Sequence, residues 1–283
     1  QTKIHSNLET MIDLVPLTSL PRSGSTLLMN VMAQNPMFFV AQDSDLSLFI
    51  SNTKEILKDS TSQQQIPYQQ YHNCAKQFCM SGTKAWIDSM KSPDQIFLDK
   101  SRTWLQEFDY IYKIIPNTKS ICIIRDLRGV VNSFEKIHNN SYIVNRNNFN
   151  YDLKENLLKQ RVDDILNLWF LKEGIVSLKE LIDLKKSCKN NIFFVKYENL
   201  ISDPQDTMNQ IYDFLDLEQF NHDFDNINQI PFYDNPYQPY GCHKIKSRIE
   251  NLKQIYTELN SEITEYIVQE YRWYYEEFYP EVF

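Results

Sequence analysis

The chain has 283 residues and a formal net charge of −8 at pH 7, which argues against general nucleic-acid binding, because such binding needs an excess of positive charge. Hydrophobic residues make up 42% of the chain and aromatic residues 13%, which is enough for a substantial core. No apolar run approaches the length of a membrane span, no signal pattern opens the chain, and no flexible linker divides it. We therefore expect one domain over residues 1–283, with no membrane span, in the cytoplasm unless a signal or anchor was removed upstream.

The five cysteines are odd in number and lack the spacing of a metal site, so we expect no bound metal. Reduced thiols are the preferred interpretation, and a Cys74–Cys79 disulfide is the open alternative. The sequence does not decide the oligomeric state, and a homodimer stays open.

Strands and helices are expected to alternate along the chain. Apolar runs predict strands at 11–20, 95–100, 120–124 and 192–195. Helical patterns are expected at 27–34, 44–58, 69–80, 134–138, 153–184, 206–215 and 264–278, with a long loop over 219–242. Such alternation predicts an α/β fold, in which a central parallel β-sheet carries helices on both faces.

The turn between the first strand and the first helix has the composition of an anion site. Backbone N–H groups converge at such a turn, and the helix dipole adds partial positive charge. In the run 21–28, Gly24 lets the backbone approach a ligand closely, Ser25 and Thr26 add hydroxyl donors, and Arg22 adds a cation. The run is not a Walker A motif, which requires a second glycine and a lysine.

A second anion site is expected about a hundred residues later. Arg125 ends the apolar strand at 120–124, the position where open parallel sheets bind ligands. Ser133 lies two helical turns further on and can face the same phosphate. For Arg128 two interpretations stay open, because it can bind the phosphate or pair with Asp126.

Taken together, the two sites resemble the sulfotransferase family that uses 3′-phosphoadenosine 5′-phosphosulfate (PAPS) as donor. The run 21–28 resembles the 5′-phosphosulfate loop of that family, and the run 124–133 resembles its 3′-phosphate motif. A third match is the strand and turn at 195–204, so the resemblance covers about residues 14–217. The motif layout is closest to that of the tyrosylprotein sulfotransferases.

The resemblance implies a sulfotransferase fold of the P-loop NTPase type, PAPS as co-substrate and no metal requirement. It also implies a set of donor-binding residues, with Tyr197 packing against adenine unless it only fills the core. The set is Arg22, Ser23, Gly24, Ser25, Thr26, Leu27, Arg125, Ser133, Tyr197, Lys244 and Lys246.

Three residues are implied as catalytic. They are Arg22, Asp43 and Lys100. When residues are counted without gaps from Arg22, Asp43 stands where tyrosylprotein sulfotransferases carry a catalytic glutamate. The alternative is that Asp43 caps the helix expected from 44. Lys100, at a strand end, matches a lysine that stabilises the bridging oxygen, and Arg102 beside it is an acceptor-side candidate. A carboxylate base is preferred to His243, because cytosolic sulfotransferases place their catalytic histidine after a mid-chain strand.

The basic run 240–248 is expected to close over the 3′-phosphate through Lys244 and Lys246, with a solvated helix start as the alternative. The predicted function is transfer of a sulfuryl group from PAPS to a hydroxyl acceptor: a carbohydrate, a small molecule or a peptide tyrosine. The alternatives are a P-loop nucleotide kinase or phosphotransferase, and a non-catalytic nucleotide-binding homologue. The tyrosine-rich loop 232–240 can line an acceptor site or simply pack on the surface.

Overall fold

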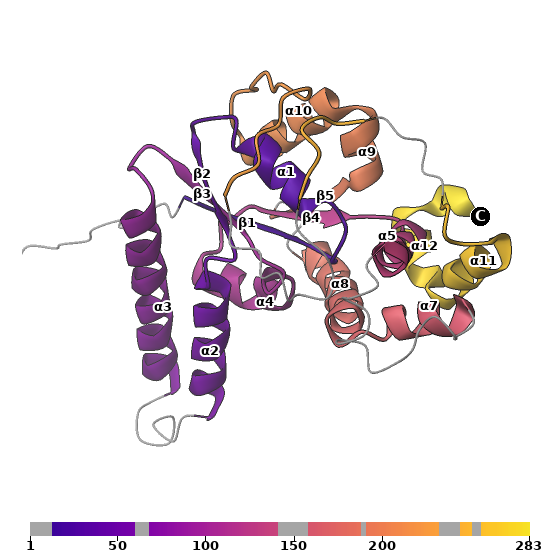
Figure 1. The fold of residues 1–283 in the computed structure, drawn as a ribbon. Coiled ribbons are helices and arrows are strands. Elements are labelled where there is room, and N and C mark those ends of the chain that lie inside the picture. The colour runs from indigo at the N-terminus through magenta and orange to yellow at the C-terminus, as the bar shows by residue number, and fades with distance from the viewer. Residues whose placement is uncertain (1–12, 60–67, 141–157, 188–190, 232–243, 251–255) are drawn as a thin grey trace, which may run out of the picture.

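The computed structural model describes residues 13–59, 68–140, 158–187, 191–231, 244–250 and 256–283. Within these residues the chain forms one five-stranded parallel sheet in the order β2-β3-β1-β4-β5 (Figure 1). The strands are β1 (Leu14–Ser19), β2 (Phe38–Gln42), β3 (Ile96–Lys100), β4 (Ser120–Ile124) and β5 (Ile192–Lys196). The predicted α/β class, with helices on both faces of a parallel sheet, is confirmed.

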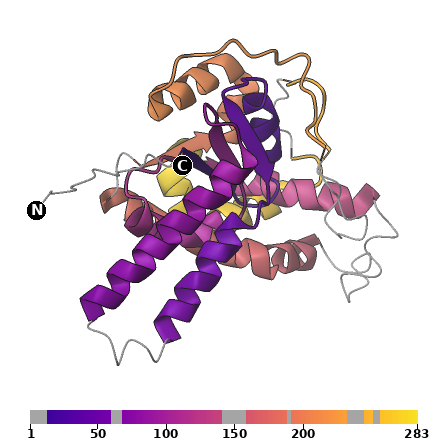
Figure 2. The same cartoon turned by 90° about the vertical axis from the view of Figure 1, so that its left-hand side faces the viewer.

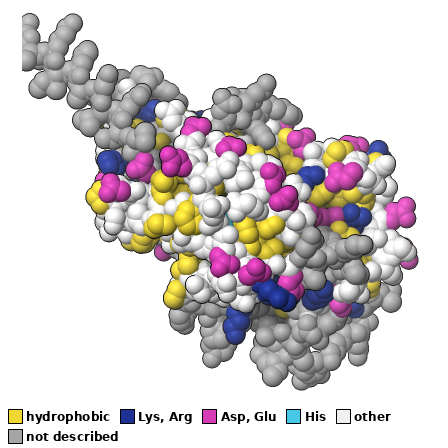
Figure 3. All heavy atoms as spheres, turned by 90° about the horizontal axis from the view of Figure 1, so that it is seen from above, with side chains coloured by type: hydrophobic (Ala, Val, Ile, Leu, Met, Phe, Trp, Pro, Cys, Tyr) yellow, Lys and Arg dark blue, Asp and Glu magenta, His cyan; other side chains and the backbone are white. Residues whose placement is uncertain are grey.

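Helices cover both faces of the sheet. Successive side chains of a strand point to opposite faces, so every residue of β1 and β4 is buried. One face packs against α1 (Ser25–Met32) and α10 (Pro204–Leu215), with the short α9 (Tyr197–Ser202) beside them. Helices of the other face include α4 (Trp104–Ile114), α5 (Leu127–Asn140), α7 (Leu158–Leu166), α8 (Trp169–Ser187), α11 (Ser261–Glu270) and α12 (Arg272–Phe278), before a 3₁₀ turn at Pro280–Val282. Figure 3 shows acidic, basic and hydrophobic side chains interspersed on the face seen from above.

Two helices lie side by side and project beyond the sheet as a hairpin (Figure 2). They are α2 (Leu46–Asp59) and α3 (Tyr68–Met90). Near the base of the hairpin, the ring of Phe49 on α2 lies 5.0 Å from that of Trp86 on α3. Helix α2 begins shortly after the end of β2, and α3 leads back to the start of β3.

Several elements differ from the sequence-based expectation. Strand β2 and helix α4 were not predicted, and α3 continues ten residues past the predicted end at 80. The helix expected over 153–184 lies outside the described residues up to 157 and then forms two helices that meet at 167–168. Asn167 donates both its backbone N–H and its side-chain amide to the Asp163 carbonyl at 2.9 Å, where α7 ends. The last predicted helix is likewise divided, at Tyr271.

Candidate functional site

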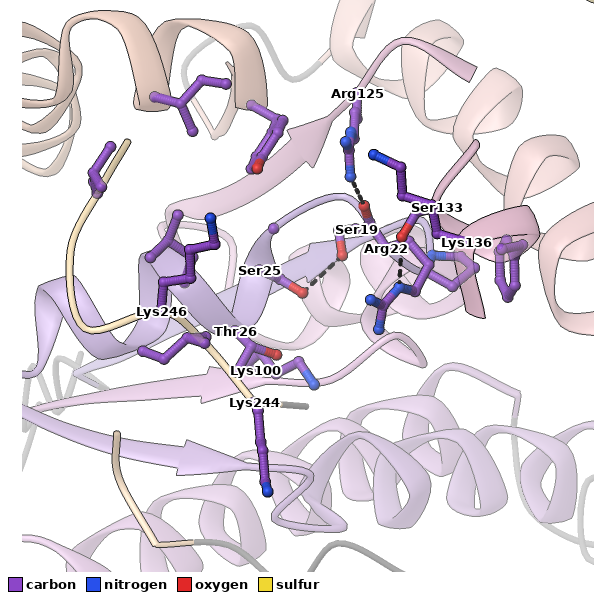
Figure 4. Close-up of a pocket in the computed structure, with 18 of the residues that line it drawn as sticks. Ser19, Arg22, Ser25, Thr26, Lys100, Arg125, Ser133, Lys136, Lys244 and Lys246 are labelled. Carbon is purple, nitrogen blue, oxygen red and sulfur yellow. Dashed lines mark hydrogen bonds between the residues drawn. The ribbon is translucent and has the colours of Figure 1, made fainter. Parts of the chain in front are cut away.

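A pocket of about 520 Å³ lies where the parallel strands end, at the sheet edge expected to bind ligands. Residues from β1, β3, the turns that follow them, the segment after β4 and the late segment 244–250 line it (Figure 4). Among the described lining residues the single carboxylate is Glu250, against eight Lys and Arg side chains. These are Arg22, Lys100, Arg102, Arg125, Lys136, Lys244, Lys246 and Arg248. Eight of the 29 Lys and Arg residues of this acidic chain thus line one cavity.

The turn between β1 and α1 forms one wall of this pocket. Gly24 precedes α1 with φ of 94°, a conformation that side chains disfavour, and no side chain caps the helix. The N–H groups of the first helical turn are therefore free to meet an anion. Ser19 donates to the Ser25 hydroxyl at 2.9 Å, while the buried Ser23 hydroxyl has no hydrogen-bond partner among the described residues.

The two anion motifs of the sequence meet in the structure. Arg22 donates its Nε–H to the Ser133 hydroxyl at 3.1 Å, and Arg125 donates to the Arg22 carbonyl at 2.7 Å (Figure 4). Burial, and then the charge of Arg125, lower the pKa of Arg22. Two guanidinium groups are thus held close together despite their repulsion. In addition, the buried Nε of Arg125 has no partner in the described part of the chain.

Tyr197 connects the second motif to the first. Its ring lies 4.3 Å from the Arg125 guanidinium, a cation–π contact, and a Cβ placed on Gly24 would lie only 2.8 Å from Tyr197 Cε2. Tyr197 is half-buried and lines the pocket. Its predicted contact with adenine stays a prediction, whereas its contact with Arg125 is a structural finding.

Arg128 takes the second of its two predicted roles. Its guanidinium donates to both carboxylate oxygens of Asp126, and Nη2 lies 2.6 Å from Oδ2. Arg128 does not line the pocket. Asp126 also accepts hydrogen bonds from the hydroxyls of Tyr256 and Tyr275. The same carboxylate accepts the Arg128 N–H at the start of α5, so Asp126 caps this helix.

Lys100 lines the pocket at the end of β3, and Asp43 lies beside it. Lys100 is only 5% exposed, and its Nζ lies 3.8 Å from Oδ2 of Asp43. Burial lowers the pKa of Lys100, and the negative charge of Asp43 opposes that effect. Asp43 lies next to Lys100 because Gln42 of β2 pairs with Lys100 of β3. The Asp43 N–H then donates to the Lys100 carbonyl at 2.9 Å.

The Asp43 side chain is 56% exposed and does not line the pocket itself. The interpretation of Asp43 as a helix cap is wrong, since α2 begins only at Leu46, whose N–H bonds the Ser44 hydroxyl at 3.3 Å. Both Asp43 and Asp45 have positive φ, 52° and 63°, a backbone conformation that Asp tolerates better than most residues. Asp43 therefore stands at the rim, beside the buried ammonium group.

The late basic segment runs past α1 as extended chain. Its described part, 244–250, is anchored by backbone hydrogen bonds from Ile227 to Ser247 and from Ile249 to Phe224, at 2.6 and 2.9 Å. The alternative of a helix start is therefore wrong for these residues. Lys244 and Lys246 are exposed and line the pocket, and Lys246 pairs with Glu250.

Several lining residues were not among the predicted site residues, and they include two basic and two aromatic side chains. Lys136 follows Ser133 by one helical turn on α5, a spacing that the sequence alone can reveal. Phe134, Phe170 and Arg248 also contribute to the wall. Phe170 lies in the first turn of α8, more than thirty residues after the second motif, and no local signal links it to the site.

Among the side chains that the structure describes, the histidine is His222, and it does not line the pocket. It is buried, and its Nε2 shares a hydrogen bond with the Tyr212 hydroxyl at 3.1 Å. Burial lowers the pKa of His222 to about 4. His243 and the tyrosine-rich loop 232–240 lie outside the described residues.

Cys74 and Cys79 are reduced thiols, so the alternative of a Cys74–Cys79 disulfide is not found, and Cys122 is not in a disulfide either. Cys188 and Cys242 lie outside the described residues. Among the residues that the structure describes, no cluster of three or more His, Cys, Asp or Glu side chains has the geometry of a metal site. No helix in the described ranges is both long and apolar enough to cross a membrane.

A parallel sheet, an uncapped helix N-terminus and two arginines surround one basic pocket, and this arrangement suits an anionic ligand. A model of the sulfotransferase family matches residues 15–222, which is most of the chain, and the chain belongs to that family. The particular likeness to tyrosylprotein sulfotransferases stays a prediction. A search of curated protein sequences found no match.

Sulfotransferases are among the solved structures similar to this chain. The sulfotransferase domain from the curacin biosynthetic pathway is 18% identical with a TM-score of 0.48, over 91% of this chain and 96% of that one. Sulfotransferase STF9 from Mycobacterium avium is 12% identical with a TM-score of 0.48, over 94% of this chain and 77% of that one. A sulfotransferase from Alicyclobacillus acidocaldarius is 11% identical with a TM-score of 0.46, over 75% and 83% of the two chains.

Proposed function

We propose that this protein transfers the sulfuryl group of PAPS to a hydroxyl acceptor. The observation that carries the proposal is the contact between Arg22 and Ser133, which joins the expected 5′-phosphosulfate loop to the expected 3′-phosphate site inside one basic pocket. A single donor with two anionic ends suits a pocket built in this way. A donor with one anionic end would leave either the loop or the arginine site unused.

The residues present fit the donor. The orphaned hydroxyl of Ser23, the orphaned Nε of Arg125 and the uncapped start of α1 are hydrogen-bond donors that lack partners among the described residues. Unpaired buried donors are costly and rare, and an anion in the pocket would meet Arg125 and the start of α1, which line it, whereas Ser23 does not line it. Gly24, Ser25, Thr26 and Leu27 would hold the 5′-phosphosulfate end, and Arg125 with Ser133 the 3′-phosphate. Lys244 and Lys246 would cover the nucleotide from the late segment.

In the proposed transfer, the acceptor hydroxyl oxygen forms a bond to sulfur while the bond between sulfur and the bridging 5′-phosphate oxygen breaks. The acceptor proton passes to Asp43, the carboxylate adjacent to Lys100. Lys100 and Arg22 stabilise the negative charge that develops on the bridging oxygen and on the sulfuryl group. Because Lys100 is almost fully buried, its charge is screened less by water than that of a surface lysine.

Ligand-induced stabilisation tests the donor. We expect 3′-phosphoadenosine 5′-phosphate (PAP) to raise the melting temperature without Mg²⁺, since a ligand that binds only the folded state stabilises it. ATP with Mg²⁺, the ligand of a P-loop kinase, is the comparison. Stabilisation by ATP with Mg²⁺ and not by PAP would contradict the proposal. Sulfate transfer from PAPS to a panel of phenols, sugars and tyrosine peptides then separates an enzyme from a non-catalytic homologue.

A further inference from the structure

Arg102 is a cation that the proposed donor does not explain. It follows β3 two residues after Lys100 and lines the same pocket. It lies near enough to Lys100 that its positive charge contributes to lowering the pKa of that lysine. The two arginines of the donor site and the late lysines already match a donor with two anionic ends. Arg102 is therefore available for another ligand.

The guanidinium of Arg102 makes no ion pair with a described carboxylate. Instead it lies 5.5 Å from the centre of the Phe170 ring, and both residues line the pocket. An arginine stacked on an aromatic ring keeps its N–H groups free at the edge of the guanidinium plane, where they can bind a carboxylate in bidentate fashion. The stacking also restricts the side chain before any ligand arrives.

An aromatic wall continues from Phe170. The ring of Phe134 lies 6.4 Å from it, and Trp169 packs edge-on against it at 5.7 Å. Phe134 is buried and lines the pocket, whereas Trp169 is 70% exposed. A flat apolar body fits such a wall, because apolar surface removed from water at this position stabilises the complex.

We propose that Arg102 and the wall formed by Phe134 and Phe170 are an acceptor subsite for hydroxyl compounds that carry a carboxylate on an aromatic body. The proposal rests on the proposed sulfotransferase function and names its acceptor class. The carboxylate lies against Arg102, the ring against Phe170, and the hydroxyl group points toward Lys100.

Three para-substituted phenols of similar size test the charge. They are 3-(4-hydroxyphenyl)propionate, which is anionic, 4-ethylphenol, which is neutral, and tyramine, which is cationic. With PAPS as donor, we expect kcat/KM to be about tenfold higher for the propionate than for 4-ethylphenol, as one charge-assisted hydrogen bond provides, and lowest for tyramine. Arg102→Gln removes this preference, and Arg102→Glu reverses it in favour of tyramine. Lys113→Gln, which removes an exposed lysine on α4, keeps the order of the three phenols.

A binding measurement covers the case in which none of these phenols is turned over. With saturating PAP present, the propionate should raise the melting temperature further in the unmodified protein and not in Arg102→Gln. Equal kcat/KM for the three phenols, or no effect of the propionate in either assay, overturns the acceptor subsite. A loss of PAP affinity of more than about tenfold in Arg102→Gln with the preference intact also overturns it, since Arg102 would then bind the donor. No stabilisation by PAP itself contradicts the proposed function instead.

Discussion

Arg22 and Ser133 are 111 residues apart in the chain, and the Arg22 Nε–H donates to the Ser133 hydroxyl at 3.1 Å. The contact exists because β1 and β4 are neighbouring parallel strands, so that the turns after them share one edge of the sheet. Arg125 completes the arrangement through its bond to the Arg22 carbonyl. Arg22, Arg125 and Ser133 line one pocket, so substitution of any of them is expected to change the affinity for a nucleotide bound there.

Arg125→Ala is expected to weaken PAP binding by about 2 kcal/mol or more, the magnitude of a lost charge-assisted hydrogen bond. The variant also removes the partner of the Tyr197 ring, so the loss should exceed that of a purely electrostatic contact. Isothermal titration calorimetry with PAP measures the difference. Arg272→Ala, which removes an exposed arginine on α12, is the matched control. Unchanged PAP affinity in Arg125→Ala would exclude Arg125 from the donor site.

Lys100→Ala and Asp43→Asn are expected to lower kcat at least a hundredfold, roughly the range for losing a general base or an electrostatic stabiliser, with PAP affinity nearly unchanged. Asparagine is chosen at 43 because it tolerates the positive φ of 52° as well as aspartate does. Single-turnover sulfate transfer from PAPS separates the chemical step from product release.

Asp45→Asn provides the control for that series. Asp45 is also exposed, also acidic and also has a positive φ, 63°, but no ion pair to Lys100 involves it. Its variant should transfer sulfate as the unmodified protein does. If Asp43→Asn behaves like Asp45→Asn, the base is a group other than Asp43.

The parts of the site that the sequence predicts are those with a local cause. Gly24 and its neighbours lie between an apolar strand and a helix, and Arg125 directly ends a fully buried strand, so both motifs are visible within about ten residues. Their meeting is not visible locally. It follows from the order of the strands, in which β1 and β4 are neighbours, and no motif in the sequence states that order.

The parts that the sequence could not decide depend on distant residues. Arg128 pairs with Asp126 in a cluster completed by Tyr256 and Tyr275, from the other end of the chain. Asp43 directly follows β2, an edge strand of five residues. An apolar run this short does not distinguish a strand from a helix, so the sequence did not predict β2. Phe170 reaches the pocket only because α8 packs against α4.

Gly24→Ala should destabilise the fold by about 1–3 kcal/mol, because a side chain is strained at φ of 94° and because its Cβ would overlap the Tyr197 ring. Displacement of that ring would also disturb Arg125. Urea unfolding measures the stability, and PAP titration measures the site. The double variant Gly24→Ala with Tyr197→Ala removes the overlap but keeps the strain, so it should lose less than the sum of the two single variants. Strict additivity would show that the ring does not constrain residue 24.

Asp99→Asn tests a buried carboxylate that lies next to Lys100 on β3. Asp99 is fully buried and accepts a hydrogen bond from the Trp104 indole at 2.8 Å, and burial raises the pKa of Asp99 from 3.8 to about 6. The folded protein therefore binds this proton more tightly than the unfolded chain does. Stability contributed by Asp99 is present at low pH and is lost as the pH rises from about 4 through 6.

Asparagine keeps an acceptor for Trp104 and cannot ionise, so the stability of Asp99→Asn relative to the unmodified protein should rise between pH 4.5 and pH 7.5. The difference between a pKa of 3.8 and one of about 6 sets an upper limit of about 3 kcal/mol on this gain. Urea unfolding at a series of pH values measures it, and Asp88→Asn on α3 controls for the loss of one exposed negative charge. If the two proteins keep a constant difference in stability across this range, Asp99 does not titrate there, and ionisation of this carboxylate is not what limits stability at neutral pH.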